Sequence, residues 1–488
     1  MALVLVLVVL TLGLGLSFAL LQAQSVQMFL QRNASHRDQA RQAALSGVSA
    51  ALRQIRQRDW AGVDTSFERS LGNGRSFRVS YTAGDASLQP TDADYWLWPY
   101  RVTITVTGRS EGPLNPQQSV EYTIELVVQL VPEKLQPVPS AWSESLSYSL
   151  FQRSGSGNGN LKVEVPCQVQ GAVRLQETLK YMQKYPEPQQ AAQRLAQDWN
   201  ALRQQGGKDH RTFTGSMELP WNKQGSDTLT LLQKLGISLS DRATDPAEDW
   251  SLAQSITSYR LYPGGPQFQA QAVSSYLQDT VLEADPKTNP LGLFYRNGSI
   301  ELGDHVQVRG TLLTYTSGNG TLYLSGHNIT IEPVSMPPLA GQTLPVQLPA
   351  LVLLQHLKVQ PGASAEIRGA VYVADRLRVT RDSQSGISFL VQGPVSLRRL
   401  NIRPRSQWDR DDDWWEDRWD EFQQSGHPWF PLWLAEQHGL DSTPRIVLSG
   451  PLQTVHYHWP DGTSPFFDYP APDQGLHWDL VRWEESGS

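Results

Sequence analysis

The first 58 residues constrain the fold of this chain more than any other stretch. The segment from Ala2 to Leu21 has no charged side chain and almost no polar one, and the first ionisable side chain is Arg32. A helix rises about 1.5 Å per residue, so twenty such residues cover the roughly 30 Å of hydrocarbon in a bilayer. No proline occurs before Pro90. We therefore predict one helix, over residues 1–58, that begins in a membrane and ends in water.

The two halves of this predicted helix differ in character. In the second half, apolar residues recur at steps of three and four, at Leu45, Val48, Leu52 and Ile55. That spacing places them on one face, which we expect to pack on the rest of the protein. In the first half every face is apolar, and the predicted membrane-contacting side chains are Leu3, Leu5, Leu7, Leu10, Leu12, Leu14, Leu16 and Leu20.

Three interpretations of this opening compete. A cleaved signal peptide has a basic first region and an apolar region of only about 7 to 15 residues. This chain has no basic residue before Arg32 and a longer apolar run, which disfavours that interpretation. An ordinary single-pass membrane anchor accounts for the apolar run alone. The third interpretation rests on a family resemblance.

The segment Met1-Ala-Leu-Val-Leu-Val-Leu-Val-Val-Leu is followed by a continuous amphipathic helix with Arg41, Ala43, Ala44 and Ala50-Ala51-Leu52. This pattern resembles the N-terminal helix of type IV pilin-like proteins, above all minor pilins and the large minor pseudopilin of type II secretion. The resemblance implies a structural filament subunit that contacts other pilin-like subunits through this helix. It also implies a bacterial protein that crosses the inner (cytoplasmic) membrane once, with its ectodomain periplasmic or extracellular.

The chain departs from the family pattern at Leu5, since most members carry a Glu at the fifth position of the mature chain. The resemblance also implies a short basic leader ending in Gly upstream of the mature start. The basic residues nearest the apolar run are Arg32, Arg37 and Arg41, all after it. Basic loops tend to stay cytoplasmic, so this rule alone would place the bulk of the chain inside the cell, whereas the pilin resemblance places it outside.

Composition narrows the class of protein. The chain has 488 residues, with 41 Lys plus Arg against 48 Asp plus Glu, a net charge of −7. That balance does not suggest a nucleic-acid partner. Cys167 is the single cysteine, which excludes an intrachain disulfide and a cysteine-based zinc site. The 38 Gly and 32 Pro indicate many turns, so we predict an α+β protein that is mostly β.

Residues 59–135 alternate apolar and polar side chains in three stretches, which begin at Phe77, Tyr100 and Val120. Turn-rich segments separate them. Period-two alternation bounded by Gly, Asn and Pro indicates strands. We predict a small antiparallel sheet that packs on the amphipathic half of the helix, the layout of a pilin head. Any other small α+β domain would show the same strands.

A different pattern recurs through residues 136–455. Four segments share the form apolar-x-Gly-x-apolar, centred on Gly171, Gly310, Gly369 and Gly393, with weaker copies at Gly326 and Gly450. Short strands with a recurring turn glycine are typical of a β-solenoid or β-helix, and a β-sandwich remains the alternative. We expect a mixed insertion at about 176–286, an acidic Trp-rich excursion at about 404–440, and an irregular Trp- and Pro-rich tail at 456–488.

No motif in the sequence predicts a catalytic, cofactor or metal site. Asp409, Asp411 and Asp413 have the spacing of a calcium loop, but Trp414 occupies the position that requires glycine. His456 and His458 would share a strand face without an identifiable third ligand. Gly-x-Ser-x-Gly, P-loop and dinucleotide motifs do not occur.

Two hypotheses follow from these patterns. The first is a membrane-anchored structural subunit that acts by assembly or adhesion, with the lipid bilayer and other pilin-like subunits as partners and no enzyme activity. The second is a membrane-anchored carbohydrate-binding or carbohydrate-active β-helix protein, for which surface glycans would be the partner. The enzyme form needs clustered carboxylates on one strand face, and the positions beside the repeat glycines carry none.

Overall fold

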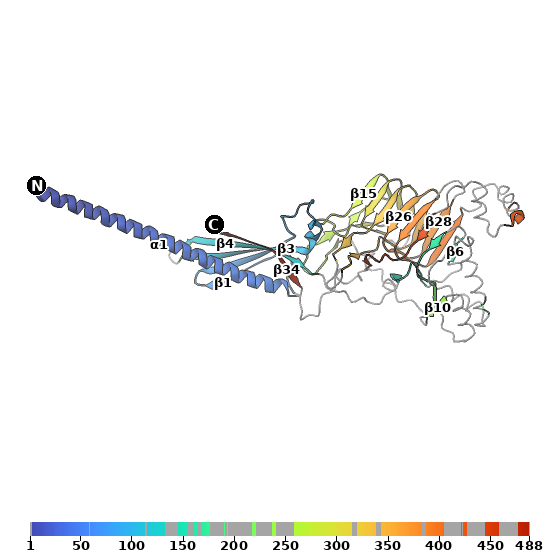
Figure 1. Cartoon of the computed structure of the whole chain (residues 1–488), viewed down its shortest axis with the longest axis horizontal. Coiled ribbons are helices and arrows are strands. Elements are labelled where there is room, and N and C mark those ends of the chain that lie inside the picture. The colour runs from blue at the N-terminus through green and yellow to red at the C-terminus, as the bar shows by residue number, and fades with distance from the viewer. Residues whose placement is uncertain are drawn as a thin grey trace. The chain divides into compact units, whose positions relative to one another are not determined.

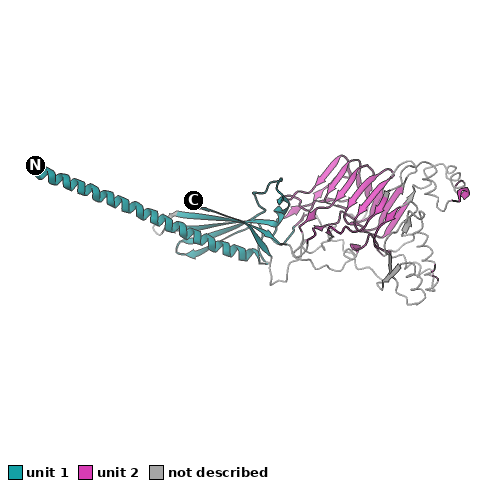
Figure 2. Ribbon diagram, in the orientation of Figure 1, with its two compact units in different colours: residues 1–131, 260–266, 469–488 teal, residues 132–259, 267–468 magenta. Residues whose placement is uncertain are grey.

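In the computed structural model, the chain forms two compact units (Figure 2). Unit 1 comprises residues 1–131, 260–266 and 469–488, and unit 2 comprises residues 132–259 and 267–468. Within them the structure describes residues 2–57, 59–112, 115–131, 145–153, 161–163, 167–175, 217–220, 237–240, 258–314, 320–337, 343–381, 387–404, 423–426, 445–457 and 477–487, together with Gln190, Gln193 and Glu421.

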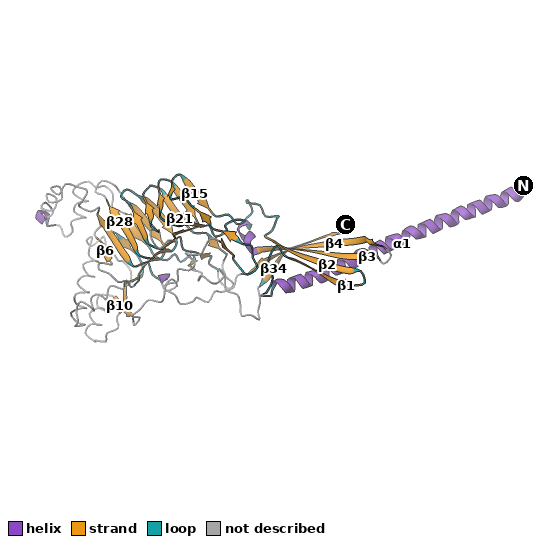
Figure 3. Cartoon of the chain, turned by 180° about the vertical axis from the view of Figure 1, so that it is seen from behind, coloured by secondary structure: helices purple, strands orange, loops and turns teal. Residues whose placement is uncertain are grey.

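Unit 1 is organised by helix α1 (Ala2–Ile55), a single helix of 54 residues. The predicted long apolar helix is confirmed. Its C-terminal part lies along one face of a sheet, and its N-terminal part extends beyond that sheet (Figures 1 and 3). The buried residues of the helix are Ala40, Ala43, Ala44, Gly47, Val48, Ala51 and Ile55.

The buried face of α1 differs from the predicted one. Val48 and Ile55 are buried as expected, but Leu45 is exposed and Leu52 is only half-buried. The sheet approaches the helix so closely that small residues are needed at the contact. A Cβ placed on Gly108 would lie 2.1 Å from the Ala40 carbonyl oxygen. The buried face is therefore centred on alanines and shifted away from the larger leucines.

The sheet of unit 1 has five antiparallel strands in the order β1-β2-β3-β4-β34. A short 3₁₀ helix (Tyr95–Tyr100) precedes β3. The strands are β1 (Ser66–Gly72), β2 (Arg75–Ala83), β3 (Arg101–Gly112), β4 (Asn115–Leu130) and β34 (Trp478–Gly487).

Strand β34 corrects the expectation of an irregular tail at 456–488. Trp478 pairs with Leu130 and Gly487 with Tyr122, so the end of the chain completes the sheet that its first strands begin. A bulge between Leu480 and Arg482 interrupts the alternation that would mark a strand in the sequence. The partner strand is more than 340 residues away in the chain, so no local pattern could reveal the pairing.

Unit 2 is built mainly from short parallel strands in three sheets. Sheet I, in spatial order, contains β10 (Ile237–Ser240), β9 (Met217–Pro220), β8 (Val173–Arg174), β5 (Leu150–Gln152), β30 (Val395–Leu397), β27 (Val371–Val373), β24 (Leu351–Leu353), β19 (Thr311–Thr314), β16 (Leu293–Arg296) and β13 (Gln271–Ala272).

Sheets II and III have seven strands each. Sheet II contains β14 (Tyr276–Leu277), β17 (Ile300–Leu302), β20 (Leu322–Leu324), β25 (His356–Val359), β28 (Arg376–Arg381), β31 (Arg399–Pro404) and β6 (Leu161–Val163). Sheet III contains β15 (Thr280–Glu283), β18 (Val306–Arg309), β21 (Ile329–Glu332), β26 (Ser364–Arg368), β29 (Ser388–Gln392), β32 (Arg445–Leu448) and β7 (Gln168–Val169). Two smaller sheets join β11 (Ser258–Tyr259) with β12 (Phe268–Gln269), and β22 (Ser335–Met336) with β23 (Val346–Gln347) and β33 (His456–Tyr457).

The chain visits the three sheets in turn. From β13 onward, each strand of sheet I is followed by one of sheet II and one of sheet III, and each pairs in parallel with its counterpart one circuit later. The first circuit in the chain, β5 to β7, lies beside the last one, β30 to β32. In each sheet, the strand that comes early in the chain therefore lies next to the strand of the last circuit.

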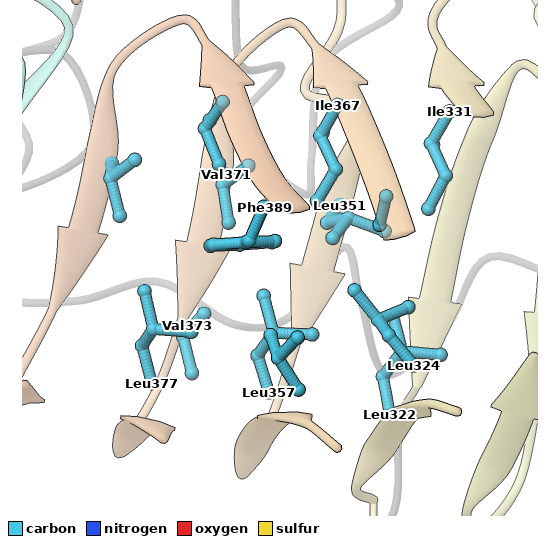
Figure 4. Close-up of a cluster of buried hydrophobic side chains, with 14 of the residues drawn as sticks. Leu322, Leu324, Ile331, Leu351, Leu357, Ile367, Val371, Val373, Leu377 and Phe389 are labelled. Atoms are coloured by element: carbon cyan, nitrogen blue, oxygen red, sulfur yellow. The ribbon is translucent and has the colours of Figure 1, made fainter. Parts of the chain in front are cut away.

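The inward side chains of the three sheets form one apolar core. Leu351 and Val371 of sheet I, Leu357 of sheet II and Ile367 of sheet III all point into it (Figure 4). Each is essentially inaccessible to solvent. Alternate residues along each strand fill this interior, as the period of a strand requires.

Part of the predicted insertion in unit 2 is regular structure. The region 176–286 was expected to be a mixed insertion, but its last part, β13 to β15, is a regular circuit of the three sheets, and β9 and β10 extend sheet I. These strands are short and widely separated, which hides their common periodicity. The acidic Trp-rich excursion at 404–440 lies almost entirely outside the described residues. The chain as described is α+β and mostly β.

Candidate anchor and assembly surface

The apolar half of α1 is uncovered. Exposure runs from 77% at Leu3 to 55% at Leu20, and Leu5, Leu7, Leu10, Leu12, Leu14 and Leu16 fall between these values. A Cβ added at Gly13 or Gly15 would meet nothing within 4 Å. Such a surface is unfavourable in water, because apolar area exposed to solvent costs about 25 cal/mol per Å².

Among the described residues, α1 is the helix that is long and apolar enough to cross a membrane, and none of its most apolar stretch is buried. Val26, Met28, Phe29 and Leu30 continue the exposed apolar surface beyond Leu21. The structure therefore presents an N-terminal helix suited to single-pass membrane anchoring.

A polar cluster ties the end of the chain to α1. Arg41 Nε lies 3.1 Å from Glu485 Oε2, and the Tyr122 hydroxyl donates a hydrogen bond to the same carboxylate. The Trp483 indole N–H donates to the other carboxylate oxygen at 3.1 Å. The Tyr122 hydrogen bond, then those from Arg41 and Trp483, lower the pKa of Glu485 to about 2. The carboxylate is therefore charged at neutral pH and holds β34 beside the helix.

A second polar cluster is buried in unit 1. Arg101 Nη1 lies 3.3 Å from Asp85 Oδ2, and both side chains are about 95% buried. Arg101 also lies 2.8 Å from Asp94, and Arg482 of β34 lies 3.2 Å from Asp85. Burial opposes ionisation of Asp85, but hydrogen bonds from Ser87 and the two arginine charges outweigh it and lower the pKa of Asp85. The cluster thus joins the segment before β3 to the last strand.

Aromatic side chains pack at the C-terminal end of α1. The Trp478 indole N–H donates to the Ile55 carbonyl oxygen at 3.2 Å. Its ring contacts Trp60 edge-on at a centroid distance of 6.0 Å and Tyr262 at 5.5 Å. Three separate pieces of the chain therefore meet at one aromatic contact within unit 1.

The four predicted repeat glycines all occupy one kind of corner. Gly171, Gly310, Gly369 and Gly393 lie in the links from a strand of sheet III to the next strand of sheet I. A Cβ on Gly393 would lie 2.2 Å from the Gly369 carbonyl oxygen, so successive corners stack in contact. The weaker copy at Gly326 lies at another corner, between sheets II and III.

Replacing Gly369 with Ala is expected to destabilise unit 2 by about 1 to 3 kcal/mol, because the change combines backbone strain with overpacking. Gly369 has φ +132°, and its Cβ would lie 2.8 Å from Pro333 Cγ. Gly298 is a matched control, since it has φ +125° but no atom closer than 3.9 Å to its Cβ. In urea unfolding, Gly298→Ala should lower the free energy of unfolding only by the cost of backbone strain, and therefore by less than Gly369→Ala. Equal losses from both changes would contradict a close-packed corner.

Among the described residues, the remaining sequence motifs do not form a binding or catalytic site. The acidic triplet Asp409, Asp411 and Asp413 and the second histidine, His458, lie outside the described residues. His456 lies in β33. Among the described residues, no group of three or more His, Cys, Asp or Glu side chains is placed to hold a metal ion.

Sequence reasoning missed both polar clusters and the aromatic contact. On each side of the bulge the sequence alternates for a few residues, at Trp478 and Leu480 and again at Val481 and Trp483, which was a partial signal for a strand. The ion pair of Asp85 with Arg101 could not be predicted from the sequence, because it depends on which segments pack together in the folded unit. Comparison of the chain with protein-family models, curated proteins and solved structures finds no match.

Proposed function

We propose that this protein is a membrane-anchored, pilin-like structural subunit of a type IV pilus or type II secretion-type filament. It would act by assembly or adhesion, without catalysis. The observation that carries the proposal is the uncovered apolar surface of α1, continuous with a C-terminal half that packs on a small antiparallel sheet. While the helix is in the bilayer, lipid chains cover this apolar surface. Once the helix leaves the bilayer, packing against similar helices in a filament core would bury the surface instead.

The location and the ectodomain form part of the same proposal. The helix would cross the inner membrane once, with both sheet-bearing units on the periplasmic or extracellular side. The three sheets of unit 2 would form a β-solenoid, in which each circuit covers the apolar edge of the next. The recurrence of strands from sheet to sheet and the stacked glycine corners support this interpretation.

Cross-linking from single cysteines placed at positions between 5 and 25 tests the assembly role. The native Cys167 is buried, which raises its pKa to about 12, so it should not compete. In cells that make filaments, these cysteines should capture other pilin-like helices. The variant Leu7→Asp should abolish capture, whereas Leu7→Ala should preserve it. If no cross-linked product forms and the protein remains a monomer in such cells, the helix is an anchor only and the assembly role is wrong.

A further inference from the structure

The segment of α1 between the uncharged run and the sheet carries an exposed apolar face. Val26, Phe29 and Leu30 lie three and four residues apart, so they share one face of the helix. Their exposed fractions are 54%, 65% and 64%. The first buried residue of α1 is Ala40, which lies about 15 Å beyond Leu30 along the helix axis. This apolar face therefore belongs neither to the uncharged run that ends at Leu21 nor to the contact with the sheet.

The opposite face of this segment is polar. Gln24, Gln27 and Gln31 recur at steps of three and four, and Asp38 continues that line. A helix with one apolar and one polar face is suited to the boundary of a membrane, where the apolar face meets acyl chains and the polar face meets headgroups and water. The segment extends the uncharged run by about 14 Å, and a helix longer than the hydrocarbon thickness tilts to keep its apolar surface in lipid.

Two arginines lie at the outer end of the apolar face. Arg32 is three residues after Phe29, and Arg37 is seven residues after Leu30, so both lie beside this face on the helix surface. Both are exposed, and within the described residues neither pairs with a carboxylate, whereas Arg41 forms an ion pair with β34 at 3.1 Å. Side chains on a helix lean toward its N-terminus, so Arg32 and Arg37 reach back toward the membrane.

We propose that Arg32 and Arg37 bind the headgroups of anionic phospholipids at the point where α1 leaves the bilayer. Asp38 is the first acidic residue of the chain, so the part of the helix nearest the membrane carries positive charge only. A guanidinium group binds phosphate oxygens through parallel hydrogen bonds. Each arginine near an anionic membrane surface strengthens the attraction about fivefold. This inference rests on the membrane anchoring by α1 that is part of the proposed function.

The surroundings of the two arginines favour lipid over an acidic protein as the partner. An acidic protein surface would bind the guanidinium groups but leave the apolar face of Val26, Phe29 and Leu30 in water. A lipid surface supplies both halves of the contact, since acyl chains cover the apolar face and headgroup phosphates meet the arginines. The segment also adjoins the run that is suited to crossing the membrane, so anchoring holds it at the bilayer surface.

Competition between two spin-labelled lipids tests the proposal. The full-length protein is reconstituted in phosphatidylcholine bilayers, and electron paramagnetic resonance measures how strongly labelled phosphatidylglycerol and labelled phosphatidylcholine associate with it. In about 0.1 M salt, phosphatidylglycerol should associate about tenfold more strongly, and in about 1 M salt this preference should fall, because the charges are screened. The variant Arg32→Gln/Arg37→Gln should reduce the preference to less than about twofold, because it removes both cations.

The matched control is Arg53→Gln/Arg56→Gln, which removes the same charge from two exposed arginines at the C-terminal end of α1. They lie about 30 Å further from the membrane along the helix, about three Debye lengths in 0.1 M salt, so the preference should stay within about twofold of the parent. Equal association of both lipids with the parent, or equal losses in the two variants, would overturn the proposal and leave the anchor intact. Release of the parent from the bilayer would overturn the proposal and the anchor together.

Discussion

A chain that starts at Gln31 is expected to be soluble without detergent, whereas the full-length chain should fractionate with membranes. The removed segment contains the uncharged run from Ala2 to Leu21 and the exposed apolar residues as far as Leu30. The buried residues of α1 begin at Ala40, and the contact of His36 with Ser110 of β3 also lies after Gln31, so the shortened chain retains the described contacts with the sheet. Sedimentation after carbonate extraction, with N-terminal sequencing of both fractions, measures the difference.

The control for this experiment keeps the length of the helix and changes its polarity. Leu10→Asp places a charge near the middle of the apolar run, which costs about 2.5 to 3.5 kcal/mol on insertion scales. That variant should move partly to the soluble fraction, whereas Leu10→Ala should remain in the membrane. A full-length chain that is soluble with its N-terminus intact would contradict the anchor.

Replacing Arg101 with Met is expected to destabilise unit 1 by about 3 kcal/mol, because it breaks a buried ion pair and leaves the Asp85 carboxylate with Arg482 but without its second arginine. Asp85 is 4% exposed and lies 3.3 Å from Arg101. Arg101 also donates to Gln129 on the neighbouring strand at 3.2 Å. Urea unfolding followed by hydrogen exchange of the backbone amides of β2, β3 and β4 measures the loss in this unit.

Arg109 provides the matched control on the same strand. Its guanidinium lies 3.6 Å from Glu111, and both side chains are about 40% exposed. Exposed pairs of this kind contribute about 0 to 1 kcal/mol, so Arg109→Met should have little effect. Adding Asp85→Asn to Arg101→Met should recover part of the loss, because it removes a buried charge that has lost one of its two arginines. Similar stability of Arg101→Met and Arg109→Met would show that the ion pair is not important.

The sequence alone predicted the helix and the strands whose patterns reflect which side chains face water, lipid or the protein interior. An uncharged run without proline can satisfy its backbone only as a helix in lipid, and α1 is that helix. Alternation around Phe77, Tyr100 and Val120 marked β2, β3 and β4, because strands with one wet face repeat every two residues. The recurring glycines marked links between short strands, since corners that stack in contact leave no room for a Cβ at Gly369 or Gly393.

Tertiary structure decided everything that depends on partners distant in the chain. The pairing of Trp478 with Leu130, the neighbouring positions of β5 and β30, and the alanine face of α1 all arise from contacts that no local pattern encodes. A periodic sequence specifies which side of a strand is buried, but the choice of neighbour is made by packing, because many short strands have nearly the same pattern.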